Sequence, residues 1–195
     1  MEDEIVVRVI DGTNAENSCL QSVCDCIRIA QTETFKRSGL RINTYGLAPN
    51  VLYEQLRAGG TCFIAEYNSS VIGTLSVFKD NRKNWYSNGG VIIKYVAVLP
   101  DWQGRHVATL LLEKAKSIYS DRVISISTDK RNRRAIDLYR KRGFVLMDIS
   151  RAKYAQSNAV KLAYWGGHGF PFKCRRAVHL AWSCFKCIVK TIIWN

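Results

Sequence analysis

Residues 96–108 read VAVLPDWQGRHVA, a stretch in which one hydrophobic pattern ends and another begins. Up to its middle, the run 91–99 is almost continuously apolar, which is typical of a buried central strand. Pro100 ends this run, because proline cannot donate a backbone hydrogen bond to a neighbouring strand. From Val107 onward, apolar residues recur at helical spacing. The stretch therefore predicts a buried strand, a turn that begins at Gly104, and a helix.

This turn has the chemistry of a phosphate site. The first amides of a helix have no partner within the helix, and the positive end of the helix dipole lies behind them, so phosphate oxygens bind there readily. Gly104 lets a ligand approach the backbone, and Arg105 adds positive charge. Many strand-to-helix turns look similar and bind nothing, so this segment indicates a phosphate site only together with other evidence.

A second informative segment, residues 131–144, reads RNRRAIDLYRKRGF. Ala135, Leu138 and Tyr139 fall on one stripe at helical spacing, and Gly143 stands where a glycine commonly ends a helix. The segment predicts a helix over 131–142.

The remaining elements follow from hydrophobic period and turn residues. We expect strands at 5–10, 61–67, 71–79, 91–99, 123–128, 144–150 and 158–165. Helical spacing covers 16–37, as one long helix or two short ones, and also 50–58, 107–118 and 131–142. This order predicts an α/β fold with a mixed sheet and two crossover helices.

Together, the two quoted segments resemble the GNAT superfamily of acyl-CoA N-acyltransferases. That family has a turn of the form Gln/Arg-x-x-Gly-x-Gly/Ala after a strand that ends Val-x-Pro. The matching residues here are Val98, Pro100, Gln103 and Ala108, whereas His106 stands where the family has glycine. The family's later helix, Asn-x-x-Ala-x-x-Leu-Tyr-x-Lys-x-Gly-Phe, is matched by Asn132, Ala135, Leu138, Tyr139, Lys141, Gly143 and Phe144.

The resemblance implies the GNAT fold, a mixed, mostly antiparallel twisted sheet flanked by helices. It implies an N-acyltransferase domain over 1–165, and the residues after it, 166–195, form a basic amphipathic extension. Specificity for the acceptor in this fold is set by the first helices and by the loops at 39–49 and 80–90. These segments do not identify the acceptor.

The resemblance also implies that acetyl-CoA or another acyl-CoA is the co-substrate. Its pantetheine arm would follow the strand at Val96 and Val98. Its pyrophosphate would rest on the turn formed by Gln103, Gly104, Arg105, His106, Val107 and Ala108. Arg105, Arg133 and Arg134 would attract the 3′-phosphate, or would form a general solvated face. His106 would donate to a phosphate when protonated, or would face solvent without a role.

The expected reaction is transfer of an acyl group, most simply acetyl, to a primary amine that attacks the thioester directly. Tyr139 matches the tyrosine that protonates the departing thiolate in many GNAT enzymes; the alternative is a core tyrosine on the helix stripe. Asn132 would contact the pantetheine arm or a bound water, or would cap the helix, for which asparagine is well suited. A backbone amide near Val98 would stabilise the oxyanion.

The base that deprotonates the amine is not evident. Residues 91–95 contain no carboxylate, although many family members carry a glutamate there. Lys94 is a poor base near neutral pH unless it is buried. Tyr95 could relay a proton through water, and Glu33 could reach the acceptor or lie on a solvated surface. We expect a water-relayed or substrate-borne proton transfer.

Charge is distributed unevenly along the chain. The chain of 195 residues has 29 Lys and Arg against 16 Asp and Glu, and a formal net charge of +13. No acidic residue follows Asp148. Such a basic tail suggests phosphate or an anionic membrane as partner, or only a solvated face. No recognition motif accompanies the charge, so nucleic acid is the least expected partner.

A helix is expected over 173–192, with an apolar stripe opposite a basic face. We expect it to dock on its own domain or on a second copy in a homodimer. Peripheral contact with a membrane surface is the alternative, and it would suit a membrane-associated long-chain N-acyltransferase. A GNAT-fold binding module without catalysis is a further alternative, because His106 and the absent glutamate both depart from the family.

Composition favours a soluble, cytoplasmic protein. No apolar run is long enough to span a membrane, and the acidic start does not resemble a secretory signal. The seven cysteines, an odd number, fit reduced thiols. Cys184-x-x-Cys187 lacks a second ligand pair at the spacing of a zinc site, so no metal is expected.

Overall fold

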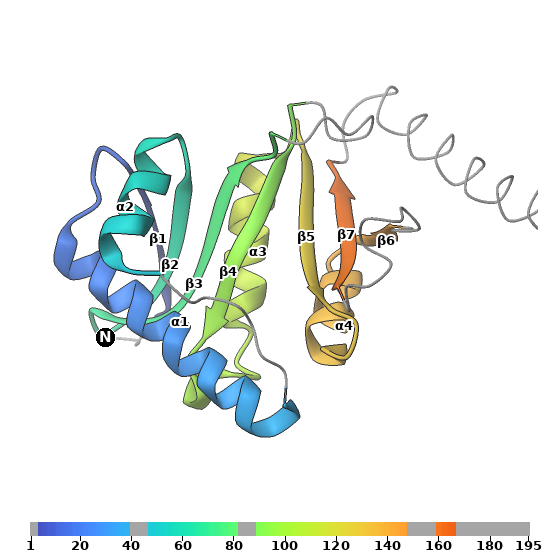
Figure 1. The fold of residues 1–195 in the computed structure, drawn as a ribbon, viewed down its shortest axis with the longest axis horizontal. Coiled ribbons are helices and arrows are strands. Elements are labelled where there is room, and N and C mark those ends of the chain that lie inside the picture. Colours follow the sequence, from blue (N-terminus) through green and yellow to red (C-terminus); the bar gives the residue numbers. More distant parts are fainter. Residues whose placement is uncertain (1–3, 40–46, 82–88, 148–158, 167–195) are drawn as a thin grey trace, which may run out of the picture.

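A computed structural model describes residues 4–39, 47–81, 89–147 and 159–166 of the chain. Within these ranges, seven strands form one sheet in the order β1-β2-β3-β4-β5-β7-β6 (Figure 1). Only β4 and β5 are parallel; the other neighbours pair antiparallel. The strands are β1 (Val6–Asp11), β2 (Thr61–Tyr67), β3 (Ser70–Lys79), β4 (Val91–Val98), β5 (Val123–Asp129), β6 (Val145–Met147) and β7 (Ala159–Trp165).

Helices cover both faces of the sheet. The two N-terminal helices, α1 (Asn17–Ser38) and α2 (Pro49–Arg57), lie on one face, and α3 (Val107–Ile118) lies on the other (Figure 1). A short 3-10 helix, η1 (Pro100–Trp102), connects β4 to α3, and α4 (Arg133–Lys141) follows β5. This mixed, mostly antiparallel α/β architecture confirms the fold class predicted from the sequence.

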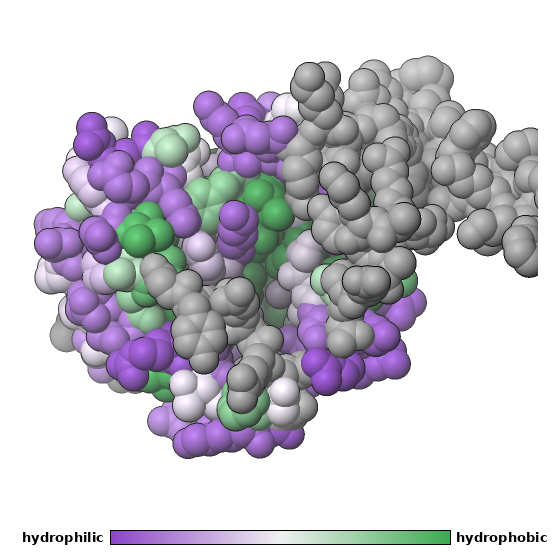
Figure 2. Space-filling view, viewed as in Figure 1, coloured by the Kyte–Doolittle hydropathy of each residue, from purple (hydrophilic) through white to green (hydrophobic). Residues whose placement is uncertain are grey.

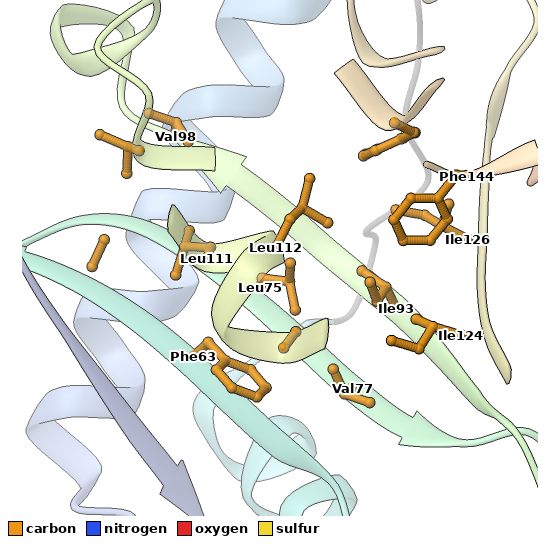
Figure 3. Close-up of a cluster of buried hydrophobic side chains, with 14 of the residues drawn as sticks. Phe63, Leu75, Val77, Ile93, Val98, Leu111, Leu112, Ile124, Ile126 and Phe144 are labelled. Atoms are coloured by element: carbon orange, nitrogen blue, oxygen red, sulfur yellow. The ribbon is translucent and has the colours of Figure 1, made fainter. Parts of the chain in front are cut away.

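The hydrophobic alternation of the strands produces a core on each side of the sheet. Phe63 and Ile64 are consecutive on β2, point to opposite faces, and are both fully buried. On the α3 side, Phe63 packs with residues from β3, β4, β5 and α3 (Figure 3). On the other side, Ile64 packs with buried residues of α1 and α2. Each such side chain stabilises the fold by about 1.5–3 kcal/mol.

The predicted elements and their order agree with the structure over the described residues, with small shifts at the ends; residues 148–150 of the strand predicted over 144–150 lie outside them. The helical spacing over 16–37 belongs to one helix, α1 (Asn17–Ser38), and not to two; it ends where Gly39 adopts a φ of 64° and donates its N–H to Phe35 O. Pro49 is the first residue of α2, a position where its missing N–H has no helical acceptor. The predicted helix over 173–192 lies outside the described residues, as do Cys184 and Cys187.

A buried ion pair joins three strands on the face opposite α3. Lys161 Nζ on β7 lies 3.8 Å from Asp80 Oδ2, just after β3, and Ser125 Oγ on β5 donates to the same carboxylate oxygen at 3.3 Å.

No helix among the described residues combines the length and the apolar character that crossing a bilayer requires.

Candidate functional site

The site begins where the parallel strands β4 and β5 separate. Their pairing covers only Val91–Ile93 against Ile124–Ile126. On its other edge, β4 carries a bulge: Lys94 pairs with Ser76 and Ala97 with Thr74, so two residues of β4 face one of β3. Tyr95, within the bulge, has a φ of 56°. Bulges bend a strand, and the separation leaves the end of β4 free to line a groove.

This groove has a volume of about 740 Å³. It is lined by the last turns of α1, the end of β4, the turn before α3, and residues 131–142. Hydrophilic side chains gather over α1 and α4, which flank the groove (Figure 2). The predicted site residues that line it are Val96, Val98, Gln103, Gly104, His106, Val107, Ala108, Asn132 and Tyr139. Segments far apart in the chain therefore meet at one place.

Arg105 is the predicted site residue that is not among those lining the groove. It is exposed, and its guanidinium carbon lies 5.1 Å from the centre of the Trp102 ring. Trp102 itself lines the groove, so the Arg105 charge still lies one side chain away. The second-rank candidates Arg133 and Arg134 both line the groove.

The turn before α3 is held by its own hydrogen bonds. Gln103 donates its backbone N–H to Pro100 O at 3.2 Å, and its side-chain amide donates to Val98 O at 3.1 Å. The first helical bond of α3 runs from Leu110 N–H to His106 O at 3.0 Å. The backbone N–H groups of residues 107–109 therefore come before the first helical hydrogen bond of α3, and they are suited to bind an anion.

His106 adopts the backbone conformation that glycine usually supplies. Its φ is 62°, in the left-handed region, and Gly104 two residues earlier has a φ of 83°. A left-handed conformation costs a non-glycine residue about 1–2 kcal/mol, although histidine is among the residue types enriched there. The departure from the family pattern therefore keeps the shape of the turn at some cost in stability.

Tyr139 and Asn132, from the segment after β5, line the same groove as this turn. Tyr139 is 5% exposed, and burial raises its pKa well above the ordinary value of a phenol, which is itself protonated at neutral pH. Asn132 caps α4: its Oδ1 accepts the N–H of Ala135 at 3.3 Å. Asn132 thus has the capping role that was the alternative to ligand contact, and it lines the groove as well.

Arg37 is a groove residue that the sequence patterns did not indicate. It lies in the last turn of α1, where its Nη1 donates to Gln103 Oε1 at 3.1 Å and its Nε donates to Glu33 Oε1 at 3.0 Å. The contact with Gln103 spans 66 positions in the chain, so no local pattern could reveal it. The Glu33–Arg37 spacing of one helical turn is the only signal the sequence offers.

The candidate bases differ in their surroundings. Glu33 lines the groove, but its carboxylate is engaged by Arg37. Tyr95 packs at the edge of the core beneath α1, with its ring 6.0 Å from that of Phe78. Lys94 is exposed, with its ammonium 5.4 Å from the centre of the Phe78 ring.

Comparison with known proteins shows that this part of the chain is similar to acetyltransferases. The model of the acetyltransferase (GNAT) family matches residues 25–144, which include the turn before α3 and all of α4. A search of curated protein sequences found no match.

Solved structures with a similar fold cover most of the chain. The PaiA N-acetyltransferase from Thermoplasma acidophilum, in complex with coenzyme A, has a TM-score of 0.64 at 12% identity and covers 82% of this chain and 99% of its own. A GNAT-family acetyltransferase from Staphylococcus aureus Mu50 has a TM-score of 0.61 at 17% identity, covering 82% and 98%. One from Streptococcus agalactiae 2603 has a TM-score of 0.61 at 13% identity, covering 84% and 96%. At these identities the likeness is one of fold.

Proposed function

This chain belongs to the acetyltransferase (GNAT) family, and from that premise we propose that it is an N-acyltransferase, most simply an N-acetyltransferase. It moves an acyl group from an acyl-CoA to a primary amine that attacks the thioester directly. The observation that carries the proposal is the meeting, in one groove, of the turn before α3 and Tyr139.

The groove fits a donor that carries phosphates. The end of β4, with Val96 and Val98, no longer pairs with β5, and on that edge a pantetheine arm would extend along its backbone groups. The turn at 103–108 supplies helix N-terminal amides for the pyrophosphate. Arg133 and Arg134 also line the groove and would neutralise a further phosphate. These features support acetyl-CoA or another acyl-CoA as co-substrate.

In the reaction, the neutral amine attacks the thioester carbon and forms a C–N bond as the C–S bond breaks. An alkyl amine has an ordinary pKa of about 10.4, so it must lose a proton before or during the attack. Because Glu33 is engaged by Arg37, a water-relayed transfer to solvent fits this proton best. A backbone amide near Val98 would stabilise the carbonyl oxygen as it gains negative charge.

Tyr139 is proposed to protonate the departing thiolate. A thiolate of pKa about 8.5 is a good leaving group, and a proton donor beside it lowers the barrier further. A phenol of ordinary pKa about 10 is protonated at neutral pH, and burial of Tyr139 raises its pKa further, so the side chain carries its proton before the reaction begins. The proton is afterwards replaced from solvent.

The direct test measures donor binding and acyl transfer separately. Acetyl-CoA at one hundred times its Kd would stabilise the fold by about 2.7 kcal/mol, seen as a raised Tm. Mass spectrometry of an amine panel then detects the acylated product, and avoids thiol reagents that would also react with the protein's own cysteines. No stabilisation by any acyl-CoA would overturn the donor assignment. Stabilisation without any product would instead favour a binding module.

The length of the transferred acyl group and an association with membranes form a finer part of the proposal. The proposed division is an acyltransferase domain at 1–165 and an extension at 166–195. The extension lies almost wholly outside the described residues. Comparing acetyl-CoA with long-chain acyl-CoA tests the acyl group. Co-sedimentation with anionic vesicles, of the full chain and of a chain ending at Trp165, tests the extension, and equal binding would rule it out as an anchor.

A further inference from the structure

Arg37, on α1, both lines the groove and contacts the turn before α3. That turn belongs to the segment between β4 and α3. Its side chain is 48% exposed, so it lies at the groove wall with access to solvent. Within the groove lining, it is the cation that contacts the turn residue Gln103 directly.

The guanidinium of Arg37 keeps hydrogen-bonding capacity after these contacts. One N–H on Nε goes to Glu33 and one on Nη1 goes to Gln103. A guanidinium carries several further donors in a planar fork, a geometry suited to bidentate contact with phosphate. Arg37 therefore has donors left for an anion bound in the groove.

The two partners of Arg37 fix where those donors lie. Glu33, one helical turn earlier on α1, holds the guanidinium at 3.0 Å and partly balances its charge. Gln103 in turn donates to Val98 O at 3.1 Å, which links Arg37 to the end of β4. Glu33, Arg37, Gln103 and Val98 form one chain of hydrogen bonds from α1 to the strand. This chain sets a positive charge at the first residue of the turn.

We propose that Arg37 is a donor-binding residue, contributed by α1, that contacts the pyrophosphate of acyl-CoA at the turn before α3. This inference rests on the proposed function. It adds to the turn a ligand from outside its own segment, and it ties the end of α1 to the donor site. Arg37 would thus hold α1 in place when the donor is bound.

The test compares donors that carry or lack the pyrophosphate. Isothermal titration would measure Kd for CoA, 3′-dephospho-CoA and pantetheine with the full-length wild type and with Arg37→Met. Loss of one charge-assisted contact should weaken CoA and 3′-dephospho-CoA by about ten- to one-hundred-fold. Pantetheine has no pyrophosphate, so its Kd should not change. Equal weakening of all three would overturn the inference, because it would mean that Arg37 only holds the turn in shape.

A second measurement does not depend on weak pantetheine binding. Salt screens charge–charge contacts, so the Kd of wild type for CoA should rise more steeply with NaCl than that of Arg37→Met. Parallel salt dependences would contradict a direct contact. Failure of wild type to bind CoA would overturn the proposed function and this inference with it. CoA binding by wild type with an unchanged Kd in Arg37→Met would overturn the inference alone.

Matched controls are available on the same helix. Arg28 of α1 is also exposed and paired with an acid, Asp25, at 2.9 Å, but it is not among the residues lining the groove. Arg28→Met should leave the Kd for CoA unchanged. Arg37→Lys keeps the charge without the fork and should recover part of the affinity. Circular dichroism and Tm would verify that each variant folds.

Discussion

The side-chain amide of Gln103 donates to the backbone carbonyl of Val98 at 3.1 Å. This hydrogen bond connects the start of the turn to the last residue of β4 and fixes the position of the turn relative to the end of the strand. The proposed pantetheine and pyrophosphate sites lie on either side of it. Gln103 is therefore expected to matter for donor binding more than for folding.

Gln103→Ala removes this bond and the one from Arg37. A net hydrogen bond contributes about 0.5–1.5 kcal/mol, so loss of two bonds that hold the turn in its donor-binding shape should raise the Kd for CoA by about five- to 150-fold. The fall in Tm should be small, because Arg37 and Gln103 lie at a solvent-accessible wall of the groove. Isothermal titration and thermal unfolding measure the two quantities. Gln21→Ala is the matched control, since that amide donates to Asp25, a residue of the same helix α1, and is not among the residues that line the groove. A large loss of Tm with unchanged CoA binding would contradict the expectation.

Tyr139→Phe tests the proposed proton donor. The substitution removes one hydroxyl and keeps the ring that packs near Phe144, so folding and CoA affinity should be retained. The rate of the chemical step should fall by about 10²- to 10⁴-fold, the range for general acid–base catalysis. Single-turnover kinetics with the identified amine measures this rate. An unchanged rate would assign Tyr139 to the core alone.

Burial raises the pKa of the Tyr139 phenol and of the Cys24, Cys26 and Cys62 thiols, so the stability of the fold should decrease at alkaline pH. The pKa of the Cys26 thiol is raised to about 12. Each group ionises more readily in the unfolded chain, so its contribution to stability is complete below its ordinary pKa and is lost as the pH rises above it. Urea unfolding between about pH 8 and about pH 11 should show falling stability. The slope should be smaller in Tyr139→Phe and in Cys26→Ala.

His106→Gly should stabilise the protein. The φ of 62° is strained for histidine and not for glycine, so the substitution relieves about 1–2 kcal/mol of strain. Glycine also has a larger conformational entropy in the unfolded chain, which destabilises the variant, and we expect the relief of strain to be the larger effect. His106→Ala removes the imidazole but keeps the strained backbone, and serves as the matched variant. Chemical denaturation should rank glycine above histidine, with alanine no higher than histidine. A less stable glycine variant would show that the imidazole contributes more than the strain costs.

The element order and most of the groove could be predicted from the sequence because their signals are local. The apolar run before Pro100 and the helical spacing after Val107 fix a strand and a helix within a few residues. The same short range brings Gln103 and Ala108 into one turn. One helix motif predicts the positions of both Tyr139 and Asn132. Their meeting with the turn followed from the resemblance to a known fold.

Other features depend on contacts that no local pattern encodes. Arg37 reaches Gln103 across the chain, and only packing of α1 on the sheet decides that meeting. The bulge at Tyr95 needs a positive φ at a residue that carries no turn signal. Pairing with β3 imposes this conformation, because Lys94 and Ala97 are held in register on either side.

Gly73 on β3 lies directly behind the start of α3. A methyl group added there would lie 2.8 Å from Cγ1 of Val107, a branched side chain with little rotamer freedom in a helix. Gly73→Ala should therefore displace the start of α3, cost about 1–3 kcal/mol of stability, and weaken CoA binding at the adjoining turn. Val107→Ala in the same chain makes room for the methyl group, so the double variant should be more stable than the sum of the single effects predicts. Additive losses in urea unfolding would mean that Gly73 and Val107 do not interact.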